Sequence, residues 1–403
     1  MPIRHLVAAA LWLAGAQAAS AEDKALVPVK VGVLNDRSGV YFDSTGEGAV
    51  VAARLALEDF RPAEHGLSVE IVSADHQNKP DVGAAVTRQW YDRDGVDAVF
   101  DVPTSSVALA VNQITKERNK VFVNSGGGTP DLTGAQCTPN TVHWTYDTVA
   151  LANSNGKAML KRGGDTWFFL AADYAFGLAL ERDTRAVVLK NGGTVLGTVK
   201  TPFPSADFSS FLIQAQGSGA KVIGLANAGG DAANAIKQAH EFGIRQGGQA
   251  LAALLISSTD IHALGTTIAQ GLTLTEAFYW DLNDGTRAFS ERFARLSNGK
   301  KPTAYQAGVY GGLLHYLKAV AALHAANDGA QVVAKMKEMP TDDPLFGKGT
   351  IRADGRKIHD MYLFEVKAPA ESTGEWDLYK LVATNPGKDV FRPLEEGGCP
   401  LVK

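Results

Sequence analysis

Three consecutive glycines follow a short run of β-forming residues in the first half of the chain. Gly126, Gly127 and Gly128 lie between Ser125 and Thr129, just after Val121–Val123. Without side chains, their backbone N–H groups can approach an anion closely. A phosphate-binding loop would continue with Gly-Lys-Ser or Gly-Lys-Thr, but Pro130 and Asp131 follow here. The segment therefore predicts contact with a polar or anionic ligand, and a simple tight turn is the alternative.

A second polar segment lies at the end of another expected strand. Thr104 and Ser105 come just after Ala98–Phe100 and open a helical stretch. Hydroxyls at this position can cap the helix, or they can present donors to an anion beside the free backbone N–H groups. The two roles are compatible, and both stay open.

Catalytic and cofactor motifs are not found. The sequence has no Gly-x-Ser-x-Gly elbow and no His-Glu-x-x-His, and its nine histidines show no ligand spacing. Gly46-Glu47-Gly48 opens a helix, but Val51 stands where a dinucleotide fingerprint has its third glycine. We expect no enzyme activity, no cofactor and no metal site.

The N-terminal residues 1–21 have the form of a secretory signal peptide. Arg4 precedes a short apolar stretch that ends in Ala19-Ser20-Ala21. The apolar stretch is too short to span a bilayer, which takes about 20 residues. We expect cleavage after Ala21, with Ala18 as the alternative, and release of the mature chain as a soluble protein without stable membrane insertion.

Composition describes an ordinary globular protein. Apolar residues make up 45% of the chain, charged residues 20%, and the formal net charge is -4. With no run of Lys or Arg, nucleic acid and anionic membrane surfaces are poor partners. Removal of the signal peptide leaves about 380 residues, which predicts two domains. The two cysteines, Cys137 and Cys399, predict one disulfide that ties the C-terminal tail to the middle of the chain, and two independent thiols are the alternative.

Short apolar β-type runs alternate with longer helical runs over most of the chain. This rhythm predicts α/β architecture with parallel sheets covered by helices on both faces. An expected irregular connector, Thr141–Asp147, separates two such units, and a helix is expected near Leu151–Arg162. Towards the C-terminus, Thr350–Arg352 and Met361–Val366 flank Asp354-Gly355, which predicts a β-hairpin.

At this point several segments resemble the type I periplasmic solute-binding proteins, especially the leucine/isoleucine/valine-binding type that feeds ATP-driven importers. The resemblance covers nearly all of the mature chain. It is carried by Val29–Gly39 with Tyr41, Ala56–Phe60, Thr104–Ser106, Asn124–Thr133 and Asp173–Gly177.

The resemblance implies two Rossmann-like lobes of the Venus-flytrap type, joined by a hinge that the chain crosses three times, near Tyr146, Phe278 and Met339. The first lobe would comprise residues 27–145 and 279–339, and the second residues 146–278 and 340–390. Residues 391–403 would form a disulfide-tethered tail. A ligand would bind where the carboxyl ends of the strands face the cleft.

The resemblance also assigns roles to single residues. The loop of Thr104 and Ser105 matches one that binds a ligand carboxylate, and Tyr41 and Phe176 match aromatic positions that flank the ligand. Gly128 replaces a threonine that holds a ligand ammonium, with Thr129 as the candidate substitute. Relatives have an ammonium-binding glutamate near Thr259. The further expected contacts near the cleft are Tyr146, Asp147, Asp260 and Phe278.

Three functions compete: a receptor that presents a small solute to the permease and ATPase subunits of an ABC importer, an enzyme, and a ligand sensor of the same fold. The receptor is favoured, acting as a monomer. The glycine-rich loop and the hydroxyls favour a carboxylate, and the aromatic residues favour an aromatic or other small organic acid. A branched-chain or other amino acid is the alternative ligand.

Overall fold

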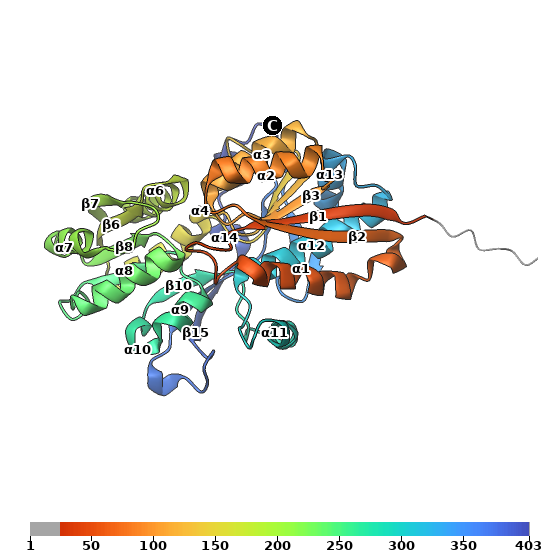
Figure 1. Cartoon of the computed structure of the whole chain (residues 1–403). Helices are drawn as coiled ribbons and strands as arrows, with labels where there is room; N and C mark the ends of the chain where they lie inside the picture. The colour runs from red at the N-terminus through yellow and green to blue at the C-terminus, as the bar shows by residue number, and fades with distance from the viewer. Residues whose placement is uncertain (1–24, 403) are drawn as a thin grey trace, which may run out of the picture.

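A computed structural model describes residues 25–402. The predicted signal peptide, residues 1–21, lies outside the described residues. Two α/β lobes stand side by side, and Figure 1 shows the first on the right and the second on the left. This arrangement confirms the predicted fold class.

The first lobe is built on a parallel sheet in the order β2-β1-β3-β4-β5. Its strands are β1 (Val27–Asn35), β2 (Leu67–Asp75), β3 (Ala98–Asp101), β4 (Val121–Asn124) and β5 (Thr141–His143). Every residue of β3, β4 and β5 is buried. Such continuous burial is typical of a parallel sheet that has helices on both faces.

Alternate residues of these strands enter two different cores. Phe100 and Val123 pack in the core that contains α1 (Gly46–Phe60) and α12 (Ala304–Leu323). Val99 and Phe122 pack in the core that contains α2 (Pro80–Asp92) and α3 (Ser105–Glu117). The period-2 alternation of strand side chains thus places one helix pair on each face. A further helix, α13 (Gly329–Glu338), packs beside β4.

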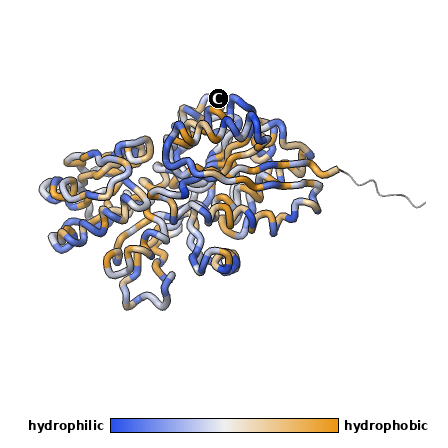
Figure 2. Tube along the Cα trace, viewed as in Figure 1, coloured by the Kyte–Doolittle hydropathy of each residue, from blue (hydrophilic) through white to orange (hydrophobic). Residues whose placement is uncertain are grey.

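The second lobe repeats the plan with a parallel sheet in the order β7-β6-β8-β9. Its strands are β6 (Thr166–Ala172), β7 (Thr194–Thr201), β8 (Val222–Ala226) and β9 (Ala250–Ala253). Its helices are α6 (Ala175–Lys190), α7 (Ser209–Gly217), α8 (Gly229–Glu241), α9 (Ser258–Leu264) and α10 (Thr266–Ala269). Figure 2 shows hydrophilic residues spread over the outer helices of both lobes, while β1 is largely hydrophobic.

Two antiparallel sheets complete the molecule. One has the order β10-β14-β15, and the other has the order β11-β12-β13. Their strands are β10 (Thr273–Glu276), β11 (Thr341–Asp343), β12 (Gly347–Ile351), β13 (Lys357–Ile358), β14 (Met361–Val366) and β15 (Tyr379–Asn385). A bridge between His143 and Arg356 attaches the β11–β13 sheet to β5. This attachment favours a third crossing at residues 359–360 rather than near Met339, and the lobe boundaries stay predictions.

The hairpin prediction was wrong in its second arm. Thr350 pairs with Ile358 across the Asp354-Gly355 turn, so the arm is β13. Met361–Val366 belongs to the other sheet, where β14 pairs with β10 and β15. The error has a physical cause: β13 has only two residues, which is too short to show an alternating pattern.

The connector prediction was also partly wrong, because Thr141–His143 forms β5 and extends the first sheet. The helix expected at Leu151–Arg162 starts earlier and is interrupted. It consists of α4 (Thr148–Leu151), the π-helical η3 (Ala152–Gly156) and α5 (Lys157–Lys161). The chain returns to the first lobe after β10 and continues into α11 (Asp284–Leu296).

The predicted disulfide between Cys137 and Cys399 is confirmed, with their Cα atoms 5.5 Å apart. Cys137 follows the short helix η2 (Pro130–Thr133), and Cys399 follows η5 (Leu394–Gly397). The remaining short helices are η1 (Pro62–His65), η4 (Pro369–Glu371) and α14 (Gly387–Val390). Over residues 25–402, no helix combines the length and the apolar character that crossing a membrane requires.

Candidate functional site

A small space lies between the lobes, where the carboxyl ends of both parallel sheets face each other. Its wall is formed by Tyr41, Ser44, Thr45, Pro103, Gly126, Tyr146, Tyr174, Phe176, Ala228, Leu255 and Tyr305. The cavity volume is ≈ 10 Å³, about the space that one water needs. Small-molecule sites typically measure about 300 Å³ or more, so a ligand would require the lobes or the rings to move apart.

Aromatic rings from both lobes fill this space. Tyr41, which follows β1 of the first lobe, shares a hydrogen bond between hydroxyl groups with Tyr174, which precedes α6 of the second lobe. The hydroxyl of Tyr146 donates to the carbonyl of Gly126 at 2.7 Å. Tyr146 also meets Tyr305 edge-on, with ring centroids 5.6 Å apart. Burial raises the pKa of all four tyrosines, so they stay neutral donors and acceptors at ordinary pH.

The glycine-rich loop after β4 is held from behind by buried polar groups. The amides of Ser125 and Gly126 both donate to the carbonyl of Asp101 at 3.2 Å. The side chain of Asn124 accepts from the amide of Gly127 at 3.0 Å and donates to its carbonyl at 2.6 Å. These contacts fix the course of the loop before any ligand is bound.

Gly128 brings this loop against the aromatic wall. A Cβ atom on Gly128 would lie 2.8 Å from the ring of Phe176 and 2.9 Å from that of Tyr146. Such distances are shorter than van der Waals contact, so a larger residue would displace the rings. The absent side chain at this position therefore sets the shape of the cavity wall.

The carboxylate of Asp101 lies under the loop and is completely buried. It accepts a hydrogen bond from Ser125 Oγ at 3.1 Å and another from Asn35 Nδ2 at 3.1 Å. Burial raises the pKa of Asp101 to about 7, although both hydrogen bonds oppose the shift. Asp101 and Val102 have φ angles of 80° and 57°, which are rare for residues other than glycine. This strained turn leads the chain from β3 to α3.

The predicted hydroxyl groups mainly tie neighbouring loops together. Thr104 Oγ1 donates to Asn78, and it makes no capping bond to α3. Ser105 Oγ accepts from the amide of Thr129 at 3.2 Å, and Thr129 Oγ1 accepts from Asp131 at 3.3 Å. The two polar segments singled out in the sequence are thus brought together in space. Their contact with a ligand stays a prediction.

Asp147 lies at the hinge rather than on the cavity wall. Its carboxylate caps α4 by accepting from the amide of Ala150 at 2.9 Å, and it lies 3.7 Å from the buried guanidinium of Arg356. Burial raises the pKa of Asp147, and the charge of Arg356 opposes that shift. Arg356 also donates to the carbonyl of Tyr146 at 2.8 Å.

Thr259 and Asp260 open α9 beside the cavity. Asp260 forms a capping box with Ser257, and Thr259 shares a hydrogen bond with Ser257 at 2.9 Å. Burial raises the pKa of Asp260 to about 6. Burial, together with the charge of Asp260, also raises the pKa of Glu276 at the end of β10. Thr259 lines a neighbouring pocket of ≈ 270 Å³ with Asp43 and His262.

Of the predicted residues, Tyr41, Gly126, Tyr146 and Phe176 lie on the cavity wall. Phe278 is buried against Phe289, with ring centroids 6.5 Å apart. Seven wall residues were not predicted from the sequence: Ser44, Thr45, Pro103, Tyr174, Ala228, Leu255 and Tyr305. Tyr174 lies within Asp173–Gly177, one of the segments that resemble the family, so the sequence could have identified it as a site residue. Ala228 and Leu255 follow strands, but their apolar side chains do not indicate a binding site in the sequence.

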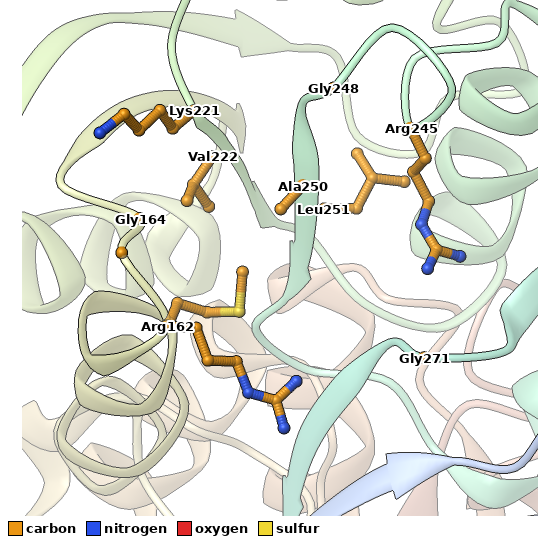
Figure 3. A pocket seen from close by; sticks show the side chains of 11 residues that line it. Arg162, Gly164, Lys221, Val222, Arg245, Gly248, Ala250, Leu251 and Gly271 are labelled. Atoms are coloured by element: carbon orange, nitrogen blue, oxygen red, sulfur yellow. The ribbon is translucent and has the colours of Figure 1, made fainter.

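A larger pocket of ≈ 310 Å³ lies at the opposite end of the second sheet, at the amino ends of β8 and β9. Figure 3 shows its three basic residues, with Lys221 directed away from Arg162 and Arg245. Arg162 pairs with Glu365 and Lys221 pairs with Asp165, each at 2.9 Å. Arg245 donates to the carbonyl of Gln270 at 2.7 Å. Ligands of open α/β sheets bind at carboxyl ends, so we place the site in the cleft.

Comparison with known proteins decides the family. A family model described as "Periplasmic binding protein" matches residues 28–374. The chain belongs to the periplasmic binding protein family. This periplasmic binding protein is 25% identical over 381 residues to "Leu/Ile/Val-binding protein homolog 6" of Brucella melitensis, covering 91% of this chain and 94% of the relative.

Solved structures agree with this assignment. A periplasmic binding protein from Burkholderia mallei is 49% identical with a TM-score of 0.90, covering 94% of this chain and 100% of the other. A branched chain amino acid ABC transporter periplasmic ligand-binding protein from Burkholderia xenovorans is 39% identical with a TM-score of 0.83, covering 93% and 100%. A solute-binding protein from R. palustris in complex with benzoate shares the fold at 20% identity, TM-score 0.79 and coverage of 89% and 96%.

Family members and fold neighbours are solute-binding receptors of ABC transporters, not enzymes. Proteins of this kind bind small molecules and work with transporter components. Among residues 25–402, no group of three or more His, Cys, Asp or Glu side chains is arranged to hold a metal ion.

Proposed function

We propose that this protein is a monomeric periplasmic receptor of an ABC importer, exported by residues 1–21, that captures a small organic acid and delivers it to the permease and ATPase subunits. An aromatic carboxylate is the favoured ligand. The observation that carries the proposal is the convergence of five aromatic residues from both lobes on one cavity: Tyr41, Tyr146, Tyr174, Phe176 and Tyr305. Flat rings bind well between aromatic side chains, because stacked and edge-on contacts add to the burial of apolar surface.

The polar end of such a ligand would be held by neutral donors. No Lys, Arg or His lies among the wall residues, and the nearby buried acids include Asp101 and Glu276. A ligand carboxylate would therefore bind beside the glycine-rich loop, at the amino end of α3, where Thr104 makes no side-chain capping bond. The amides of Ser125, Gly126, Gly127 and Thr129 already donate within the protein. The benzoate complex of the R. palustris protein supports this choice, since it shows that the fold accepts an aromatic acid.

An amino acid is the second candidate, and one observation favours it. Asp260 and Glu276 are both buried, and the charge of Asp260 adds to burial in raising the pKa of Glu276, so the ammonium group of an amino acid would be a suitable counter-ion. The branched chain amino acid ligand-binding protein of Burkholderia xenovorans, at 39% identity, points the same way. Gly128 opposes this candidate, because it lacks the hydroxyl that the relatives' threonine offers to the ammonium.

A thermal-shift and calorimetry screen tests the proposal. Benzoate, 4-hydroxybenzoate, acetate, leucine and glutamate would be added separately to the mature protein. We expect an aromatic acid to stabilise the protein by about 3–4 kcal/mol at several hundred times its Kd. Stabilisation by leucine alone would select the amino-acid candidate. A wild-type protein that none of the five compounds stabilises would contradict both.

A further inference from the structure

The loop after β1 forms a rigid projection of the first lobe. We call residues 36–45 the hook loop. The carboxylate of Asp36 organises it by accepting hydrogen bonds from the amides of Gly39 and Tyr41, at 2.7 and 2.8 Å, and from Asn78 Nδ2 at 2.6 Å. All of these partners belong to the first lobe. The hook loop therefore keeps its shape whatever the position of the second lobe.

The hook loop reaches across the cleft to the second lobe. The amide of Gly230, in the first turn of α8, donates to the carbonyl of Val40 at 3.0 Å. The hydroxyl groups of Tyr41 and Tyr174 share a second hydrogen bond. Phe203 stacks on Tyr174 with ring centroids 4.0 Å apart and lies 6.0 Å from the ring of Tyr41. Direct contact between the lobes is thus both polar and aromatic.

Gly229 makes this contact possible. Its φ angle is +57°, and a Cβ atom on it would lie 2.4 Å from the carbonyl oxygen of Val40 and 2.8 Å from the ring of Tyr41. The neighbouring Gly230 is different, because a Cβ atom there would lie 3.6 Å from the nearest atom of Val40, which is ordinary contact. Only Gly229 has a steric reason to lack a side chain where the hook loop docks.

We propose that docking of the hook loop on Gly229 and Gly230 stabilises the closed arrangement of the lobes through contacts between the lobes themselves. Gly229 is then a positioning residue for lobe closure: it does not line the cavity itself, but it lies next to Ala228 and against Tyr41, which do. The inference rests on the proposed function, because it assumes capture by lobe closure.

Small-angle X-ray scattering of the ligand-free mature protein tests this inference. Gly229→Ala should increase the radius of gyration relative to wild type, because its Cβ collides with Val40 and Tyr41. Gly230→Ala should leave the radius unchanged. Gly219→Ala controls for backbone strain. Gly219 has a φ of +68°, but no atom lies within 4 Å of the place that a Cβ would take. This variant should also scatter like wild type.

A Gly229→Ala protein that scatters like wild type would overturn the inference. Circular dichroism and the melting temperature establish that each variant is folded. Tyr174→Phe tests the same contact between the lobes without adding bulk, because it removes only the hydrogen bond between the hydroxyl groups of Tyr174 and Tyr41. It should also enlarge the ligand-free protein, by less than Gly229→Ala does, and an unchanged radius in both variants refutes the docking role.

The outcome is separable from that of the ligand screen. The scattering experiment contains no ligand, so it can fail while benzoate or leucine still binds the wild-type protein. Conversely, a wild-type protein that binds none of the five compounds contradicts the proposed function and leaves the scattering result standing.

Discussion

Gly128 sets the distance between the glycine-rich loop and the aromatic wall of the cleft. The rings of Phe176 from the second lobe and Tyr146 from the hinge pack directly against it. Well-packed interiors tolerate added methyl groups poorly, because side chains leave their preferred rotamers. The effect of a side chain at this position should therefore appear in binding as well as in stability.

We expect Gly128→Ala to weaken solute binding at least tenfold and to lower the free energy of unfolding by about 1–3 kcal/mol. Calorimetric titration with benzoate and with leucine measures the first effect, and urea unfolding measures the second. Gly217→Ala is the matched control, because no atom lies within 4 Å of its Cβ position. Equal affinities of Gly128→Ala and wild type would refute the role given to this glycine.

Asp101 should make stability depend on pH in an unusual direction. Burial raises its pKa from 3.8 to about 7 in the folded protein, so the folded state binds the proton more tightly than the unfolded state. The stability that this group contributes is complete below a pH of about 4 and is lost as the pH rises through about 7. Most paired carboxylates have the opposite effect, because their pKa is lowered by folding.

Replacing Asp101 by Asn should remove this loss. Between about pH 5 and pH 8, the free energy of unfolding of Asp101→Asn should gain about 1–3 kcal/mol relative to wild type. Urea unfolding across this pH range is the measurement. Asp284→Asn, whose side chain is fully exposed in the wild type, should show no such gain. Parallel pH curves for wild type and Asp101→Asn would contradict the prediction.

At the scale of elements, length and periodicity separated what could be predicted from what could not. The strands and helices of both parallel units were predictable, because β1, α1 and α12 carry long regular patterns. The three-residue β5 and the two-residue β13 were not, since so few residues show no period. Their pairing comes from tertiary contacts, such as the bridge between His143 and Arg356.

The candidate site divides in the same way. The glycine-rich loop and Tyr41 each follow a strand, and this position in the sequence identified them as candidate site residues. Tyr305 lies in the first turn of α12, and only the fold brings it to Tyr146. Arg356 lies more than two hundred residues from Asp147 in the sequence, so no local pattern could have predicted their ion pair.

The start of α4 should depend on that ion pair. Removing the side chain in Asp147→Ala deletes the cap and leaves the guanidinium of the fully buried Arg356 without this carboxylate. We expect a loss of about 3–5 kcal/mol in the free energy of unfolding. Asn283→Ala, which deletes the cap of α11, should cost only about 1 kcal/mol. Equal losses in urea unfolding would show that Arg356 does not need Asp147.

At the scale of the whole molecule, the disulfide joins two segments that lie 262 residues apart in the sequence. Cross-linking so long a loop reduces the conformational entropy of the unfolded chain, and in the chain-entropy model this reduction is the main source of the disulfide's stabilising effect. The double variant Cys137→Ser/Cys399→Ser should lose about 2–5 kcal/mol in the free energy of unfolding. A wild-type sample treated with reductant is the matching control, and it should melt with the variant. An unchanged melting temperature would show that the bond adds nothing.

The tail that this bond secures also touches the segment following the glycine-rich loop. Arg392 donates to the carbonyls of Pro130 and Thr133, at 3.2 and 3.4 Å. A newly made chain with two free thiols lacks the covalent part of this support. If the chain is exported as we propose, oxidation of the two thiols would complete the support of the segment that follows the glycine-rich loop.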